Sequence, residues 1–395
     1  MKTQVAAIEF GTSKIVTLIA QSGGLDRCDI VGSGTVPYDG YMDGDWNTPD
    51  QLLQAVCNSL SAAEIEANSK IREVYVGIPG EYVHICTGEA EIEVPEGEEI
   101  SEEMINRVQD MVADKLNIAG MGGYVLHRSP AWFVVDEGKK TMTPLGVHGA
   151  KLSASVSFIV ADPQFIEDMK EIFGALNITI LGFLAPTLGE SLLLLSLDDR
   201  DHGALLIDVG YLNTEISAVE GDAITFHTVL PMGGCQLTVD LCEGLGIPMR
   251  AAEQIKRAYV FNPDEFEADQ YLEADDGEGG HLSFPREYVA EILEDTMDSL
   301  CEEIALCVKN DAAPHLGARS QLFLTGGGIA LMRGGREHLA ACLNRPIKVP
   351  VAKSAKMNSP VFASALGLVD LIFDSIEQQT PKDSGGIKKL KGLFK

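Results

Sequence analysis

Three short stretches combine glycines with small polar residues in the way that phosphate binding requires, and the first two also carry an acid. They are IEFGTSK (8–14), IDVGYLNT (207–214) and LFLTGGGIALMRGG (322–335). Each begins with an apolar run typical of a buried strand. Bound phosphate needs backbone N–H groups that converge on it, and glycine and small side chains let the backbone come that close. The three stretches are therefore candidate phosphate-binding turns.

Each turn supplies its own candidate ligands. The first would present backbone amides from a hairpin tip, and its lysine would add a positive charge. In the third, a helix is expected to follow the glycines, so that its amides face the α-phosphate or ribose of a nucleotide. The candidates are Gly11, Thr12, Ser13 and Lys14 in the first turn, Gly210, Asn213 and Thr214 in the second, and Gly326, Gly327 and Gly328 in the third.

Two acids, Glu9 and Asp208, stand at matched places, each two residues before a turn glycine. Magnesium ions retain water ligands readily, so two carboxylates on opposite sides of a cleft could hold hydrated Mg²⁺ through its waters. They are also the candidate catalytic residues. An acid-x-Gly at a strand end is often only a turn, and three glycines are often only a tight connection. The prediction of a phosphate-binding site therefore rests on the three turns occurring together, in this order.

The region of the first turn recurs about 200 residues later. VAAIEFGTSKIVTLIAQSGGLDRCDIVGSG (5–34) and GALLIDVGYLNTEISAVEGDAITFHTVLPMGG (203–234) share one plan: an apolar strand, a tight turn and two further strands. Such internal repetition predicts two similar lobes that face one another. Ligands usually lie in the cleft between such lobes.

This order of motifs resembles the actin, Hsp70 and sugar-kinase ATPase superfamily, and within it the FtsA family of actin-like bacterial cell-division proteins. Four features support the FtsA family: VLPMGGCQLTVDLCEGLGIPMRAAEQIKRAY (229–259), an insertion at 83–160, PVFASALGLVDL (360–371) and a basic amphipathic tail. The resemblance implies an α/β actin-like ATPase fold with two duplicated lobes around a nucleotide cleft. It also implies an inserted α+β subdomain, 1C, in the first lobe.

The resemblance further implies ATP and Mg²⁺ as cofactors. It adds Gly233, Gly234 and Met332 to the cofactor-binding residues, and it places Glu253 and Lys256 at the adenine and ribose. Taken without the resemblance, AAEQIKRAY (251–259) is better explained as a solvated helix face.

The resemblance divides the chain into alternating parts of two lobes. The expected parts are 1A at 1–82, 1C at 83–160, 1A again at 161–200, 2A at 201–250, 2B at 251–315, 2A again at 316–355, the closing helix of 1A at 356–377, a linker at 378–386 and a membrane-targeting tail at 387–395.

The second turn departs from the family pattern Asp-x-Gly-Gly-Gly-Thr, because Tyr211 and Leu212 replace two small residues. A bulky residue at a position that needs positive φ costs on the order of 1 kcal/mol or more, and the side chains would crowd a γ-phosphate. We therefore expect nucleotide binding with slow hydrolysis at most, the nucleotide acting as an assembly switch.

The chain carries a formal net charge of −29, yet its end, GGIKKLKGLFK (385–395), is basic. On a helix, its apolar residues fall within an arc of about 120° flanked by lysines, the pattern of a helix lying in an anionic membrane surface. A disordered charged end is the alternative. The predicted membrane-binding residues are Ile387, Lys388, Lys389, Leu390, Lys391, Leu393, Phe394 and Lys395.

The acidic body argues against binding of nucleic acid through general electrostatics. Neither a signal peptide nor an apolar run long enough to span a membrane is evident. The resemblance implies self-association into filaments and docking of the FtsZ C-terminal tail on subdomain 2B. The expected location is the cytoplasmic side of the cell membrane at the division septum. A pilus-assembly scaffold of the PilM type, and less so a small-molecule kinase, remain the alternatives.

Overall fold

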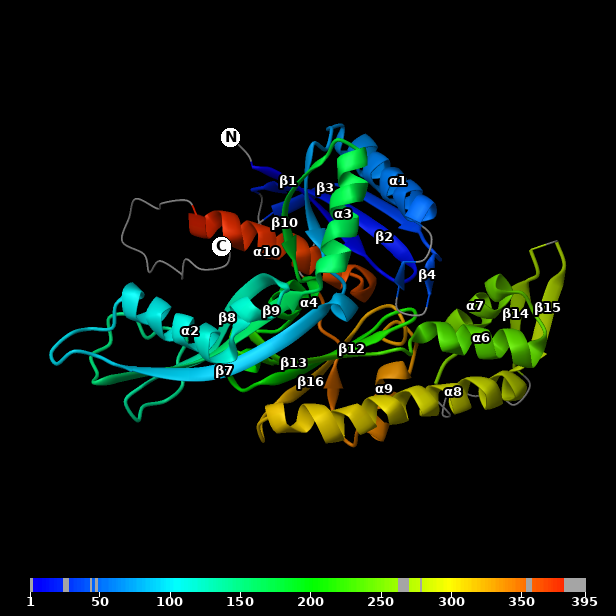
Figure 1. Cartoon of the computed structure of the whole chain (residues 1–395). Helices are drawn as coiled ribbons and strands as arrows, with labels where there is room; N and C mark the ends of the chain where they lie inside the picture. The colour runs from blue at the N-terminus through cyan, green and yellow to red at the C-terminus, as the bar shows by residue number, and fades with distance from the viewer. Residues whose placement is uncertain are drawn as a thin grey trace.

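Figure 1 shows the protein as a computed structural model with two sheet-based lobes. Residues of both lobes line one cleft. The structure describes residues 3–23, 28–42, 45–46, 49–261, 270–277, 279–352 and 357–379. The predicted tail at 387–395 and residues 380–386 of the predicted linker lie outside the described residues.

The first lobe is built on a five-stranded sheet. Its order is β3-β2-β1-β6-β10, formed by Cys28–Pro37, Lys14–Ser22, Gln4–Phe10, Glu73–Gly77 and Thr179–Leu184. Strand β2 runs antiparallel to both β1 and β3, whereas β1, β6 and β10 run parallel to one another. Two short strands of two residues each, β4 (Tyr41–Met42) and β5 (Asp45–Trp46), form a pair and follow β3 in the sequence.

The second lobe repeats this sheet strand for strand. Its order is β13-β12-β11-β16-β17, formed by Ala223–Leu230, Thr214–Glu220, Ala204–Val209, Gln321–Thr325 and Ile347–Lys348. Strand β12 is antiparallel to β11 and β13, and β11, β16 and β17 are parallel. The predicted duplication is therefore present in both strand order and strand direction.

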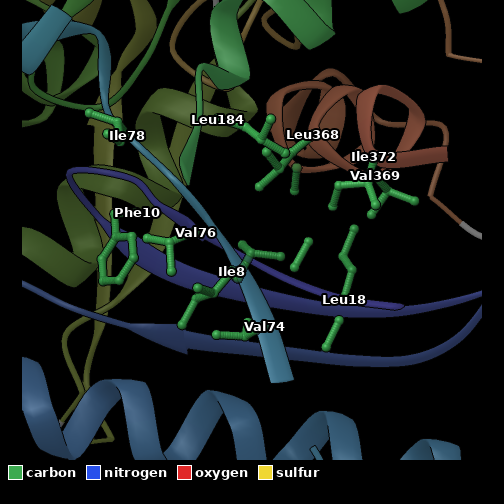
Figure 2. Packing of buried hydrophobic residues seen from close by; sticks show 14 of the residues in the cluster. Ile8, Phe10, Leu18, Val74, Val76, Ile78, Leu184, Leu368, Val369 and Ile372 are labelled. Atoms are coloured by element: carbon green, nitrogen blue, oxygen red, sulfur yellow. The ribbon is translucent and has the colours of Figure 1, made fainter. Parts of the chain in front are cut away.

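Helices cover the first sheet on both faces. Helix α1 (Pro49–Ala67) packs on β2 and β3, and α10 (Ala363–Gln379) packs on β1 and β2. Figure 2 shows Leu368, Val369 and Ile372 of α10 directed toward the strands that carry Ile8 and Leu18. Helix α1 and strand β3 pack so closely that a Cβ on Gly34 would lie 1.8 Å from the carbonyl oxygen of Ser59.

The core of the second lobe continues outward into a helical extension. Helices α6 (Gly234–Leu245), α7 (Met249–Ala258) and α8 (Arg286–Cys307) pack with the ribbon of β14 (Tyr271–Asp275) and β15 (His281–Pro285). Helix α9 (Gly335–Cys342) packs against α8. The described part of residues 262–285 forms this ribbon.

The predicted insertion is a separate α+β unit. Its sheet, β7-β9-β8, consists of Val83–Glu93, Lys151–Ala161 and Tyr124–Val135, and α2 (Glu102–Leu116) packs on it. Helix α2 begins where Ser101 accepts a hydrogen bond from the amide of Met104, the N-cap arrangement that serines favour. Residues Val108, Val112 and Phe133 form part of a core of its own.

The insertion contacts both lobes. The Ser157 hydroxyl donates to the carbonyl oxygen of Ile224 in β13 at 2.6 Å. On the other side, Nε2 of His127 in β8 accepts from the amide of Ala185, at 2.9 Å, at the start of α4 (Pro186–Leu194). The second lobe is thus held to the first through the insertion as well as directly.

Helices α4 and α10 cross at two glycines. A Cβ on Gly189 would lie 2.3 Å from the carbonyl oxygen of Gly367, and one on Gly367 would lie 2.2 Å from the amide nitrogen of Glu190. Such spacing leaves no room for any side chain at the crossing. Helices α3 (Pro163–Ala175) and α5 (Leu197–Asp201) complete the connections of this part of the chain.

Two of the predicted boundaries shift. The closing helix, expected over 356–377, begins at Ala363 after a 3₁₀ turn at Pro360–Phe362, and it continues to Gln379, two residues into the expected linker. None of the described helices has both the length and the apolar character needed to cross a bilayer.

Candidate nucleotide-binding cleft

The first two turns are equivalent hairpins in the two lobes. In the first, the amide of Gly11 donates to the carbonyl oxygen of Lys14 at 2.9 Å. In the second, the amide of Gly210 donates to that of Asn213 at 2.8 Å. The strand registers agree, since Phe10 pairs with Ile15 and Val209 pairs with Thr214. Glu9 and Asp208 therefore occupy equivalent positions in the two lobes.

The two hairpins line one cleft of about 610 Å³, which is within the usual size range of small-molecule sites. Both lobes and the third turn contribute to its wall. The predicted residues that line it are Glu9, Gly11, Thr12, Ser13, Lys14, Asp208, Gly210, Asn213, Gly234, Glu253, Lys256, Gly326, Gly327 and Gly328.

Three predicted residues do not line the cleft. Thr214 is fully buried and its hydroxyl donates to the carbonyl oxygen of Met232. Met332 packs against the core of the second lobe. Gly233 lies where a Cβ would come within 2.5 Å of the carbonyl oxygen of Tyr211, so its role here is close backbone packing.

The third turn packs on the second. A Cβ on Gly326, whose φ is +86°, would lie 2.1 Å from Oδ1 of Asp208, and one on Gly328 would lie 2.5 Å from the carbonyl oxygen of Gly210. The expected helix does not follow directly, because α9 begins only at Gly335. The Gly328 amide donates to the carbonyl oxygen of Val209. The glycines bring the two segments into contact, and a helix N-terminus does not form at this point.

The matched acids are costly to ionise in this cleft. Burial raises the pKa of Glu9 to about 7, opposed by Lys14 and assisted by Glu215. Burial likewise raises the pKa of Asp208 to about 7, with Glu215 and Glu9 adding to the effect. Burial lowers the pKa of Lys14, although both acids oppose this. Within the described residues, Oδ1 of Asp208 is buried without a hydrogen-bond partner.

Sequence reasoning missed three further acids near these two. Glu81, Glu190 and Glu215 each have a pKa raised by burial. The Thr187 hydroxyl donates to Glu215 at 2.7 Å, and the Thr325 hydroxyl donates to Glu190 at 3.3 Å. Glu190 carried a usable signal, a lone acid inside the apolar helix sequence PTLGESLLL. Glu81 and Glu215 stand in unremarkable sequence.

The Glu253 and Lys256 pair is not a solvated helix face. Lys256 is only 5% exposed, and its ammonium donates to the carbonyl oxygen of Gly234 at 3.0 Å and to the Thr238 hydroxyl at 2.8 Å. Glu253 lies 2.6 Å from the same ammonium and 2.7 Å from Arg257. These contacts tie α7 to α6 at the wall of the cleft.

The bulky residues of the second turn are accommodated without backbone strain. Neither Tyr211 nor Leu212 is among the non-glycine residues with positive φ. The carbonyl oxygen of Tyr211 accepts from the amide of Cys235 at 2.7 Å, and the amide of Leu212 donates to the Thr12 hydroxyl at 3.1 Å. The predicted cost of positive φ therefore does not arise, and the turn instead reaches across to the first lobe.

Two duplicated lobes around this cleft define an actin-like ATPase fold. Solved structures agree. The chain is similar to the PilM–PilN type IV pilus biogenesis complex, with a TM-score of 0.61, 17% identity, and coverage of 94% of this chain and 98% of that one. It is also similar to MreB5 of Spiroplasma citri bound to AMPPNP, with a TM-score of 0.53, 12% identity, and coverage of 95% and 99%.

Sequence comparison narrows the class. The family "Cell division protein FtsA" matches residues 205–367, and "SHS2 domain inserted in FTSA" matches residues 80–160. The Neisseria meningitidis cell division protein FtsA is 25% identical over 98% of this chain and 94% of that protein. The Escherichia coli K12 protein is 24% identical over 92% and 89%. These findings support an FtsA-type, actin-like cell-division protein.

Proposed function

We propose that the protein binds ATP with Mg²⁺ in the cleft, polymerises, and tethers FtsZ to the inner face of the cytoplasmic membrane at the septum. The observation that carries the nucleotide site is the pair of register-matched hairpins with Glu9 and Asp208 facing one cleft. In the described chain, no hydrogen bond engages the amides of Thr12 and Ser13, which leaves them for a phosphate.

The residues present fit a hydrated magnesium ion. Among the residues that the structure describes, Oδ1 of Asp208 has no hydrogen-bond partner, and burial raises the pKa of both matched acids despite the nearby Lys14. Among the described residues, no three acid, histidine or cysteine side chains are placed to hold a bare metal ion, so coordination through water suits the site. Bound Mg²⁺ would neutralise phosphate charge, and Glu9 and Asp208 would hold its waters.

We assign the nucleotide to assembly and expect slow turnover at most. Lys14 would approach the phosphates, and Gly326–Gly328 with Glu253 and Lys256 would border the nucleoside. Slow turnover is expected because Tyr211 and Leu212 replace two small residues of the second turn, where their side chains would crowd a γ-phosphate. ATP binding would then serve as a switch between conformations.

Titration of the purified chain with labelled ATP and Mg²⁺ tests the nucleotide site. Binding in the micromolar range with slow turnover is expected. Absence of binding at millimolar nucleotide would remove the cofactor proposal, and turnover of many per second would remove the switch.

The proposed partners follow from the family. FtsZ would dock its C-terminal tail on subdomain 2B, which includes α7, α8 and the β14–β15 ribbon, and copies of the chain would form filaments. The predicted tail, Ile387–Lys395, would attach the filament to anionic lipid. The two FtsA family matches favour this over the PilM-like scaffold, whose likeness lies in the fold. Co-sedimentation of FtsZ with lipid vesicles, with and without the chain, tests the tether.

A further inference from the structure

We propose that the turn Gly210–Thr214 makes the cleft selective for nucleoside diphosphates over triphosphates, because Leu212 and Asn213 close the space between the two hairpin tips. This inference rests on the proposed nucleotide site. It makes triphosphate binding dependent on separation of the tips, which gives the proposed switch a physical basis.

The first observation is direct contact between the tips. The amide of Leu212 donates to Oγ1 of Thr12 at 3.1 Å. A phosphate oxygen held by both turns would lie about 2.9 Å from each donor, so the two donors would stand roughly 4–6 Å apart. At the observed distance no phosphoryl group fits between Thr12 and Leu212.

The Leu212 side chain strengthens this contact. It is partly buried and packs against the hydrophobic core of the first lobe, although it belongs to the second. Separation of the tips would return this apolar surface to water, which is unfavourable. A terminal phosphate must therefore compete with packing as well as with a hydrogen bond.

Asn213 closes the same space by a second route. It occupies the hairpin position that Lys14 occupies in the first lobe. Its amide Nδ2 donates to Oε1 of Glu81 at 2.5 Å and lies 3.4 Å from the hydroxyl of Tyr41, both in the first lobe. The carboxylate of Glu81 thus already occupies the position that an anion would take at Nδ2 of Asn213. The second turn also has a neutral side chain, Asn213, where the first turn has the cation of Lys14.

Calorimetric titration of the full chain with Mg²⁺-ADP and with the Mg²⁺ complex of a β,γ-imido ATP analogue tests the inference. The wild type should bind the diphosphate at least about tenfold more tightly. The double variant Leu212→Gly, Asn213→Ala should bring the two affinities within about threefold. Glu81→Gln, which preserves shape, should narrow the ratio as well. This second variant keeps the test informative if the double variant does not fold. Leu306→Ala, at an exposed position on α8, is the control and should keep the wild-type ratio.

Each outcome decides a different point. Equal affinities in the wild type would overturn the inference and leave the nucleotide site intact. A wild-type preference that persists in both variants would also overturn it, because the selectivity would then lie elsewhere. Failure of the wild type to bind either ligand would remove the proposed nucleotide site and this inference with it.

Discussion

Glu9 and Asp208 show how burial and function oppose each other at single residues. Both sit in equivalent hairpins, and burial raises the pKa of each to about 7. An acid whose pKa is higher in the folded state than in the unfolded chain binds its proton more tightly when folded. Its contribution to stability is therefore present at low pH and is lost as pH rises toward 7. A bound cation would restore it.

The direction of this pH dependence of stability can be tested with Asp208→Asn, which keeps the shape of the side chain and removes its charge. At pH 8 without Mg²⁺ the variant should be more stable than the wild type by on the order of 1–3 kcal/mol, and at pH 4 the two should be equal. Magnesium should raise the melting temperature of the wild type at pH 8 and leave the variant unchanged. Asp295→Asn, an exposed acid on α8, is the control. Equal responses of both proteins to Mg²⁺ would count against the metal site.

His127 gives the opposite pH dependence. It is 1% exposed, and burial lowers its pKa to about 3. A base whose pKa is lower in the folded state contributes stability above its unfolded pKa, near 6.5, and that contribution is lost as pH falls below it. Protonation of Nε2 would also remove the acceptor for the amide of Ala185.

Replacement by His127→Ala should cost about 2–4 kcal/mol at pH 7.5, from the cavity and the unpaired amide. Between pH 7.5 and pH 5 the variant should lose about 2 kcal/mol less stability than the wild type, since it lacks the group that resists protonation. Urea unfolding at the two pH values measures both effects, with the exposed His281→Ala as reference. An identical loss of stability between pH 7.5 and pH 5 in the wild type and the variant would show that His127 does not control stability in this pH range.

At the scale of elements, the crossing of α4 and α10 fixes the position of α4 in the first lobe. Gly189 and Gly367 let the two backbones touch, and α4 carries Thr187 and Glu190 from there into contact with Glu215 and Thr325 of the second lobe. The crossing therefore sets where the acids of the cleft stand.

Gly367→Ala should destabilise the protein by about 1–3 kcal/mol, because the new Cβ would fall 2.2 Å from the amide nitrogen of Glu190. Gly174→Ala is a matched control. It is also a helical glycine, in α3, but its Cβ would meet nothing within 4 Å, so it should be neutral or stabilise by up to about 1 kcal/mol. Denaturant unfolding compares them. A loss no larger in Gly367→Ala than in Gly174→Ala would mean that the helices can separate freely.

At the scale of the whole molecule, the contacts that hold the lobes together in the described chain include three sets. They are the tips of the two hairpins, the bonds of α4 to the second lobe, and the insertion, which joins β13 to the start of α4. Any opening of the cleft must break the first set and strain the third.

The proposed attachment to a membrane is also a matter of the whole molecule. The acidic body should be repelled by anionic lipid, so the tail would have to make the contact, and tails linked in a filament would bind together. Deletion of 387–395 should abolish flotation with anionic vesicles. Leu390→Asp with Phe394→Asp, which keeps all four lysines, should reduce it at least about tenfold. Wild-type flotation of this double variant would show that charge alone is sufficient.

The sequence by itself determined the plan of the molecule. The repeated strand-turn-strand pattern, the glycine turns and the matched acids predicted duplicated lobes and part of the cleft lining, because hydrophobic periodicity and glycine are local signals. The resemblance to the FtsA family implied the inserted subdomain and the remaining predicted cleft residues.

Only the tertiary structure decided which residues meet. Glu81, Glu190 and Glu215 come from three separate segments, and no local pattern brings them beside Glu9 and Asp208. Taken without the family resemblance, the sequence pattern predicts a solvated helix face at Lys256. The packing of α6 against α7 buries this side chain instead. Tyr211 and Leu212 appeared to be a strained departure from a glycine turn. The packing of one lobe on the other instead gives Leu212 a partner in Thr12, because contacts between segments far apart in the chain depend on how the lobes fit together.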